Sequence, residues 1–206
     1  AQKSDLEDFN EADAQLPNQY RSAEMITAYE RIYSTSTHKV SYAAADFLQK
    51  YDAATDLRPA KFYGDADENG NRPNNKVLAT SQYRCSFRTG ELYLNAAEAA
   101  ARMDKLKEAR ERLLQLMEKR YTPEGYARKA TVVEAVDKEA LIAEILEERA
   151  RELAFEGHRW FDLRRTTRPR IDKVIEGTTY TLQQDDARYT LRIPRVATEA
   201  NPGLLN

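Results

Sequence analysis

Apolar residues recur at helical spacing along much of the chain, and the pattern is strongest after Arg88. Two apolar faces follow one another there, separated by Met103 and Asp104. Alanines on the first face allow the second helix to approach closely, which predicts an antiparallel helix pair with a tight turn. The first face consists of Leu92, Tyr93, Ala96, Ala97 and Ala100, and the second of Leu106, Ala109, Leu113, Leu116 and Met117.

The spacing of this pair partly fits the helical repeat of about 34 residues that is typical of tetratricopeptide proteins. One such unit stands out in the sequence, and a generic helix hairpin gives the same pattern. We therefore expect a mainly α protein with antiparallel helix pairs of tetratricopeptide-like type, long loops and a small C-terminal β-hairpin.

Weaker patterns predict the remaining elements. Asp137 is placed to open the longest helix, which runs to about Gly157 or kinks there and continues. Thr131 and Glu134 form a possible capping box for a short helix in the connector over residues 120–136. Further predictions are helices over 22–33 and 41–51, a long loop over 55–82, strands over 178–182 and 189–193, and an extended tail over 194–206.

Composition excludes several classes of function. The chain has 206 residues, 32 Lys and Arg against 34 Asp and Glu, and a net charge of -2, which argues against a nucleic-acid partner. No apolar run approaches the roughly 18 residues of a membrane span. A lone cysteine, Cys85, cannot close an intrachain disulfide. We expect one mostly helical domain over residues 1–206 and no cofactor.

Charged residues on the core face of the long helix are the most unusual feature. Arg149 and Glu156 fall on the same side as Ile145 and Leu153, and burying an unpaired charge costs several kcal/mol. Partners occur at helical spacing, so we predict a semi-buried ion network that ties this helix to its neighbours. The predicted members are Arg149, Glu152, Glu156, Arg159 and Asp162, with Glu148–Arg151 as a further pair.

Two chemical alternatives share this segment. Glu156, His158 and Asp162 could ligate a metal, although the spacing lacks a second His or Cys. Glu148, Glu152 or Glu156 could act in a hydrolase, but the surrounding arginines would hold these carboxylates ionised. We therefore expect no enzyme activity.

A second candidate metal site lies in the long loop. Asp65, Asp67, Asn69 and Gly70 follow the first half of a calcium loop. Lys76 stands at the twelfth position, where calcium requires a bidentate Glu. A plain polar loop is the favoured interpretation of residues 65–76.

Tyrosines are abundant, with 12 Tyr against 6 Phe. Tyrosine combines an apolar face with a hydrogen-bonding tip, which suits stacking on sugar rings or peptide contacts. Phe62, Tyr63 and Tyr83 lie in or beside the long loop and are the predicted ligand contacts, with packing against the body as the alternative.

Four motifs resemble the SusD/RagB family. The stretch from Arg88 to Ala99 is similar to its R-x-x-E-x-x-L-x-x-A-E-A signature, and Glu148 to Arg165 is similar to its block E-R-x-x-E-L-x-x-E-G-x-R-x-x-D-L-x-R. Asp56–Arg58 resembles its D-x-R element, and Ile193–Pro194 with Asn201–Pro202 resembles its closing I-P and N-P elements.

This resemblance implies an outer-membrane nutrient-binding lipoprotein on the outer face of the cell. Such proteins deliver oligosaccharides or peptides to a TonB-dependent (SusC-like) transporter and are not enzymes. The match corresponds to the C-terminal portion of a member, so the lipid anchor is expected outside these residues. The family's charged signature residues are architectural, in agreement with the predicted network. A helical-repeat scaffold that binds a peptide or protein partner is the alternative.

Overall fold

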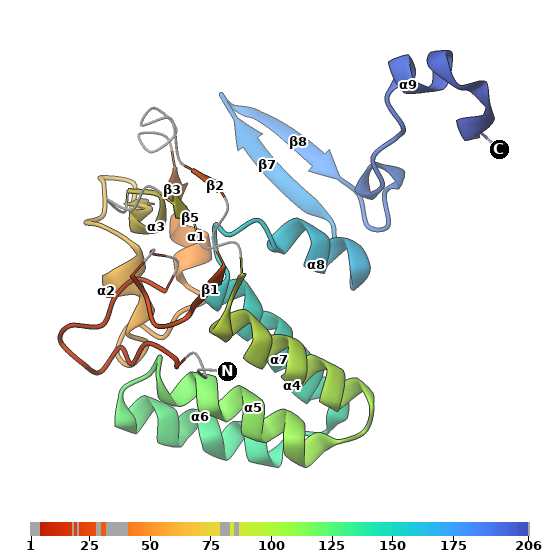
Figure 1. The fold of residues 1–206 in the computed structure, drawn as a ribbon. Helices are drawn as coiled ribbons and strands as arrows, with labels where there is room; N and C mark the ends of the chain where they lie inside the picture. Colours follow the sequence, from red (N-terminus) through yellow and green to blue (C-terminus); the bar gives the residue numbers. More distant parts are fainter. Residues whose placement is uncertain are drawn as a thin grey trace. The chain divides into compact units, whose positions relative to one another are not determined.

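The computed structural model describes residues 5–17, 19, 21–27, 30–31, 41–78, 83–84 and 87–205 (Figure 1). The chain forms two compact units, Ala1–Phe155 and Glu156–Asn206. Helices predominate, accompanied by small antiparallel strand pairs. The predicted mainly α fold is therefore confirmed.

Four long helices form the body of the first unit: α4 (Thr89–Arg102), α5 (Leu106–Glu118), α6 (Pro123–Ala135) and α7 (Lys138–Glu152). Helix α4 packs on both α5 and α7, and α5 packs on α6 (Figure 1). The α4–α5 pair is the predicted antiparallel pair. Leu94, Ala97 and Ala101 of α4 are fully buried and meet Leu113 and Leu116 of α5 in one core cluster.

Short elements precede the four helices. Three two-stranded antiparallel ladders pair β1 with β6, β2 with β5 and β3 with β4. A second core cluster is built from Phe9, Ala43, Tyr51, Phe62 and Tyr63. The elements are β1 (Met25–Thr27), β2 (Glu30–Arg31), β3 (Tyr42–Ala43), α1 (Ala45–Leu48), α2 (Arg58–Phe62), β4 (Arg72–Pro73), α3 (Asn75–Leu78), β5 (Tyr83–Arg84) and β6 (Phe87–Arg88).

Several local predictions for this unit were wrong. Residues 25–27 are extended instead of helical, because Met25 pairs with Arg88 of β6. The predicted long loop over 55–82 contains α2 and α3; Pro59 lies in the first turn of α2, where a missing N–H costs nothing. Helix α1 begins after Ala44 and is shorter than the predicted 41–51.

The N-cap residues of α6 and α7 agree with the sequence prediction for α7 and differ from it for α6. Thr122, not Thr131, caps α6, and its hydroxyl accepts a hydrogen bond from the Gly125 N–H at 3.2 Å. Thr131 lies inside α6. Asp137 caps α7 as predicted, accepting from the Ala140 N–H at 2.9 Å. Helix α7 ends at Glu152, and a new helix begins after Gly157, whose φ of 87° is left-handed.

The second unit contains a β-hairpin between short helices. Helix α8 (Arg159–Arg165) precedes β7 (Ile171–Ile175) and β8 (Thr178–Leu182), which pair in register from Ile171–Leu182 to Ile175–Thr178. The predicted second strand over 189–193 was wrong, because Asp186 caps a 3-10 turn, η2 (Ala187–Tyr189). The tail holds α9 (Arg195–Ala200) and η3 (Pro202–Leu205), so its extended prediction was also wrong.

Candidate functional site

Charged side chains meet in the interior of the first unit. We call this set the arginine–carboxylate cluster, and all of its members are at most 6% exposed. Its charges balance, with four arginines and four carboxylates. The members are Arg58, Arg88, Arg120 and Arg151, with Glu24, Asp56, Glu148 and Glu152.

Glu152, in the last turn of α7, lies at the centre of the cluster. Its carboxylate accepts from Arg88 Nη1 at 2.8 Å and from Arg120 Nη2 and Nε, both at 3.0 Å. Arg58 Nη1 adds a longer bond of 3.3 Å. One fully buried carboxylate therefore links arginines of α2, of β6 and of the turn after α5.

Glu148 lies one turn earlier on α7 and links a second group. It accepts from Arg58 Nη1 at 2.6 Å and from Arg151 Nη2 at 2.7 Å. The Tyr121 hydroxyl accepts from Arg58 and donates to Glu148, at 2.8 and 3.2 Å. Asp56 holds the other edge of the Arg58 guanidinium with bonds of 2.9 and 2.7 Å.

The segment before β1 completes the cluster. Glu24 accepts from Arg88 at 2.9 Å and also forms an ion pair with Arg120. Arg120 Nη1 donates to the Glu7 carbonyl at 2.5 Å, and its guanidinium lies 4.4 Å from the centre of the Phe9 ring. Glu24 and the Glu7 carbonyl are thus attached to the helical body through buried arginines.

The pKa values of the central carboxylates are lowered. Burial acts to raise the pKa of Glu148, but the charges of Arg58 and Arg151 outweigh it and hold that pKa at about 2. Burial likewise opposes ionisation of Glu152, and Arg120, Arg88 and Arg58 bring its pKa well below the usual range. Both groups are ionised at neutral pH, so they are poor proton donors. Their lone pairs are already used by arginines, and the arrangement suits stabilisation better than acid–base chemistry.

Several residues of the cluster belong to the motifs that resemble the SusD/RagB family, among them Arg58, Arg88 and Glu152. A family model described as the SusD family matches residues 19–204. The chain belongs to the SusD family. A search of curated proteins found no matching sequence.

The SusD-family signature residues do not all lie in the cluster. Glu152 is central, whereas Arg149 donates to Asn95 of α4 at 2.6 Å. Asp162, in the second unit, is buried and accepts from Arg165 at 2.7 and 3.0 Å. Glu156 and Arg159 are half-buried, and both take part in further contacts.

Sequence reasoning missed the partners that complete the cluster. Asp56, Arg58 and Arg88 stand in the short SusD-like motifs, so a signal for them was present. Glu24 and Arg120 carry no local signal. Arg120 pairs with both Glu24 and Glu152, positions far from it in the sequence, which helical spacing along one segment does not reveal.

Two of the predicted ligand aromatics, Phe62 and Tyr63, lie in the second core cluster. Phe62 is 0% and Tyr63 is 1% exposed. The Tyr51 hydroxyl donates to the Arg151 carbonyl, so the Tyr63 hydroxyl is the donor in the 2.8 Å Tyr63–Tyr51 bond. Ligand contact by these rings stays a prediction, and their burial disfavours it. The backbone of Tyr83 belongs to β5, while its side chain lies outside the described residues.

The calcium-like loop is held by its own hydrogen bonds. Asp67 Oδ1 accepts from the Asn69 and Asn71 N–H groups at 2.9 and 2.8 Å, whereas Asp65 and Asn69 are exposed. Lys76 is buried and donates to the carbonyls of Glu152 and Ala154. Within the described part of the chain, no group of three His, Cys, Asp or Glu side chains could hold a metal ion.

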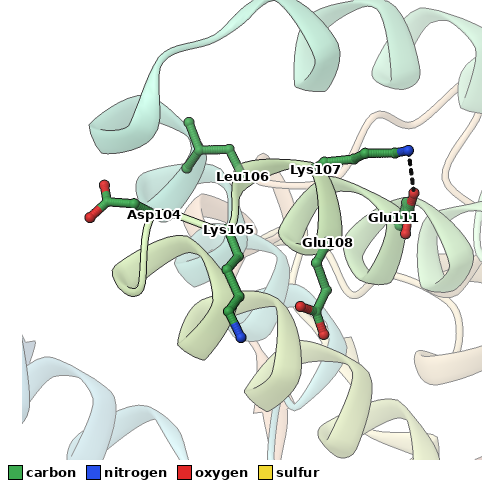
Figure 2. Close-up of a pocket in the computed structure, with 6 residues that line it drawn as sticks. All are labelled: Asp104, Lys105, Leu106, Lys107, Glu108 and Glu111. Atoms are coloured by element: carbon green, nitrogen blue, oxygen red, sulfur yellow. Dashed lines mark ion pairs between the residues drawn. The ribbon is translucent and has the colours of Figure 1, made fainter.

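A shallow depression of about 570 Å³ lies at the α4–α5 turn (Figure 2). Lys107 and Glu111 form an ion pair of 3.9 Å across one side of it. Its lining consists of exposed charged side chains around half-buried Leu106 and includes no aromatic ring. The depression is therefore poorly suited to stacking on a sugar. Among the residues described, no helix is long and apolar enough to cross a membrane.

Proposed function

We propose that this SusD-family chain takes part in surface nutrient uptake, binding an oligosaccharide and delivering it to a TonB-dependent transporter. The match to the SusD family over residues 19–204 carries the proposal. Members of that family are binding proteins at the outer membrane, held there by a lipid anchor, and they work with SusC-like transporters. We place this protein on the same outer face.

The chemistry of the buried cluster supports a binding role rather than catalysis. The carboxylates of Glu148 and Glu152, which an enzyme would need as acid or base, are buried, ionised and bound by arginines. We propose that the protein is not an enzyme and that the cluster positions the helices around a non-covalent ligand site. No cofactor is needed for such a role.

Isothermal titration calorimetry tests this function. The protein is titrated with maltoheptaose, cellohexaose, xylohexaose and mannohexaose, and with a mixture of short peptides. We expect saturable binding of at least one oligosaccharide. Saturable binding of peptides alone would instead favour a helical scaffold with a peptide partner, and no binding of any sugar would contradict the proposal.

A second measurement tests the delivery step. The protein is co-expressed with a SusC-like transporter from the same genome, and the transporter is purified through an affinity tag. We expect both proteins to elute together in detergent. Elution of the transporter alone would contradict the proposed partnership without affecting the calorimetric result.

A further inference from the structure

Two aromatic rings of the second unit stack face to face. Trp160 of α8 and Tyr189 of η2 have ring centres 5.0 Å apart and planes inclined by 14°. Tyr189 is 0% exposed, and its hydroxyl donates to the Pro169 carbonyl at 2.5 Å. The tyrosine ring is therefore a fixed base, and the indole lies flat upon it.

The indole remains accessible although its partner is buried. Trp160 is 37% exposed. Because Tyr189 stacks on one face of the indole, the opposite face and the outer rim are the parts of the ring left for a ligand to contact. Packing has already fixed the orientation of this ring, so a ligand that stacks on it loses little further side-chain entropy.

The chemistry of an open indole face selects a particular kind of ligand. The face of an aromatic ring carries partial negative charge, which attracts weakly positive C–H groups. A pyranose ring presents several C–H groups on one face while its hydroxyl groups point outward to water. A flat aromatic face therefore suits a sugar ring, whose polar groups remain hydrated.

A charged donor stands beside the indole. Arg164 follows Trp160 by four positions on α8, so the two side chains are neighbours on the helix surface, and Arg164 is exposed. An apolar protein patch docked on Trp160 would have to desolvate this guanidinium, which is unfavourable. A polyhydroxylated ligand instead gains hydrogen bonds from it.

We infer that Trp160, backed by Tyr189 and flanked by Arg164, is a stacking platform for one pyranose ring of an oligosaccharide. This inference rests on the proposed sugar-binding function and names the contact residue and the ligand class. Phe161, the neighbouring residue, is 62% exposed, and no stacking partner is seen for it among the described residues. Phe161 is therefore the control: it is an exposed aromatic side chain of the same helix that is not backed by a second ring from the described part of the chain.

Intrinsic fluorescence provides a direct test, because Trp160 is the single tryptophan of the 206 residues. Acrylamide should quench the free protein efficiently. Addition of the oligosaccharide that binds in calorimetry should shift the emission to shorter wavelength and protect the indole from acrylamide. Weak quenching before any sugar is added would show that the ring face is covered in solution and would overturn the inference.

Substitutions separate the platform from the wider function. Trp160→Ala should weaken the calorimetric affinity by at least about tenfold, Trp160→Phe should weaken it less, and Phe161→Ala should change it less than about twofold. Far-UV circular dichroism checks that each variant folds, and Trp160→Phe keeps an aromatic ring on Tyr189.

The failures of the two proposals can be distinguished. Wild-type binding that leaves Trp160 fluorescence unchanged, with unaltered affinity in Trp160→Ala, would overturn the platform and leave the sugar-binding function intact. Absence of binding by every oligosaccharide would overturn the sugar-binding function, and the platform with it.

Discussion

Glu152 accepts a 2.8 Å hydrogen bond from Arg88, a residue 64 positions earlier in the chain. The same carboxylate also binds Arg120, which lies 32 positions away. Helix α7 is therefore joined to β6 and to the turn after α5 by a single side chain. Both pairs lie in an interior from which water is excluded, so each partner depends on the other for its charge balance.

Replacing Glu152 should destabilise the protein severely. Glu152→Gln leaves Arg88 and Arg120 with less negative charge in a buried site, and we expect a loss of about 3–5 kcal/mol in the free energy of unfolding, measured by urea denaturation. Glu147→Gln is the control, because its ion pair with Lys50 is 42% and 35% exposed and should contribute less than about 1 kcal/mol. Equal losses in the two variants would contradict the role assigned to Glu152.

Stability should depend on pH through Glu148. Its pKa is about 2 in the folded protein against 4.5 for a free side chain. The unfolded state therefore binds the proton first, so the stabilisation is complete above about pH 4.5 and is lost as the pH falls toward 2. Urea midpoints of the wild type and Glu148→Gln, measured in steps from pH 7 to 3, should differ most above pH 4.5. A constant difference across the whole range would contradict this prediction.

Gly125→Ala should destabilise α6, although Gly→Ala in a helix usually stabilises by about 1 kcal/mol. A Cβ atom at Gly125 would lie 2.4 Å from Thr55 Cβ, which is a steric clash because non-bonded carbon atoms do not approach so closely. We expect a loss of about 1–3 kcal/mol in thermal or chemical unfolding. The double variant Thr55→Gly with Gly125→Ala removes the clash and should recover part of that loss; no recovery would show that another contact is responsible.

Removing the cap of α7 should have a smaller effect. Asp137→Ala eliminates the acceptor for the Ala140 N–H and should cost about 1 kcal/mol. Asp137→Asn keeps an oxygen acceptor at the same position and should stay within a few tenths of a kcal/mol of the wild type. Guanidinium denaturation distinguishes the two, and identical midpoints for both variants would contradict a capping role.

The sequence was most informative where one helix face meets another. Ala97, Leu113 and Leu116 of the two predicted faces lie in the core, so the α4–α5 pair could be predicted, although Leu92 of the first face is exposed and Leu94 is buried in its place. Met25 could not be placed by the same rule, because its extended conformation depends on pairing with Arg88 far along the chain. Local periodicity cannot reveal a partner of that kind.

The candidate site, like the fold, could be predicted from the sequence only where the interacting residues lie close together in the chain. Charges on the apolar side of α7 indicated that partners must exist, and Arg151 could be assigned to Glu148 from a spacing of three. Arg120 is 0% exposed, yet an arginine between two helices ordinarily suggests a surface position. Its burial depends on carboxylates of α7 and of the segment before β1, which only the folded chain brings together.

Glu24, from the segment before β1, is one of the four negative charges of the arginine–carboxylate cluster. A shortened version of the protein for crystallisation or for fusion to another domain must therefore start upstream of this residue. A later start would leave Arg88 and Arg120 with Glu152 as their one shared carboxylate in a buried site. The first residue of a shortened protein should therefore be chosen to keep the buried charges paired, and not from where the helices begin.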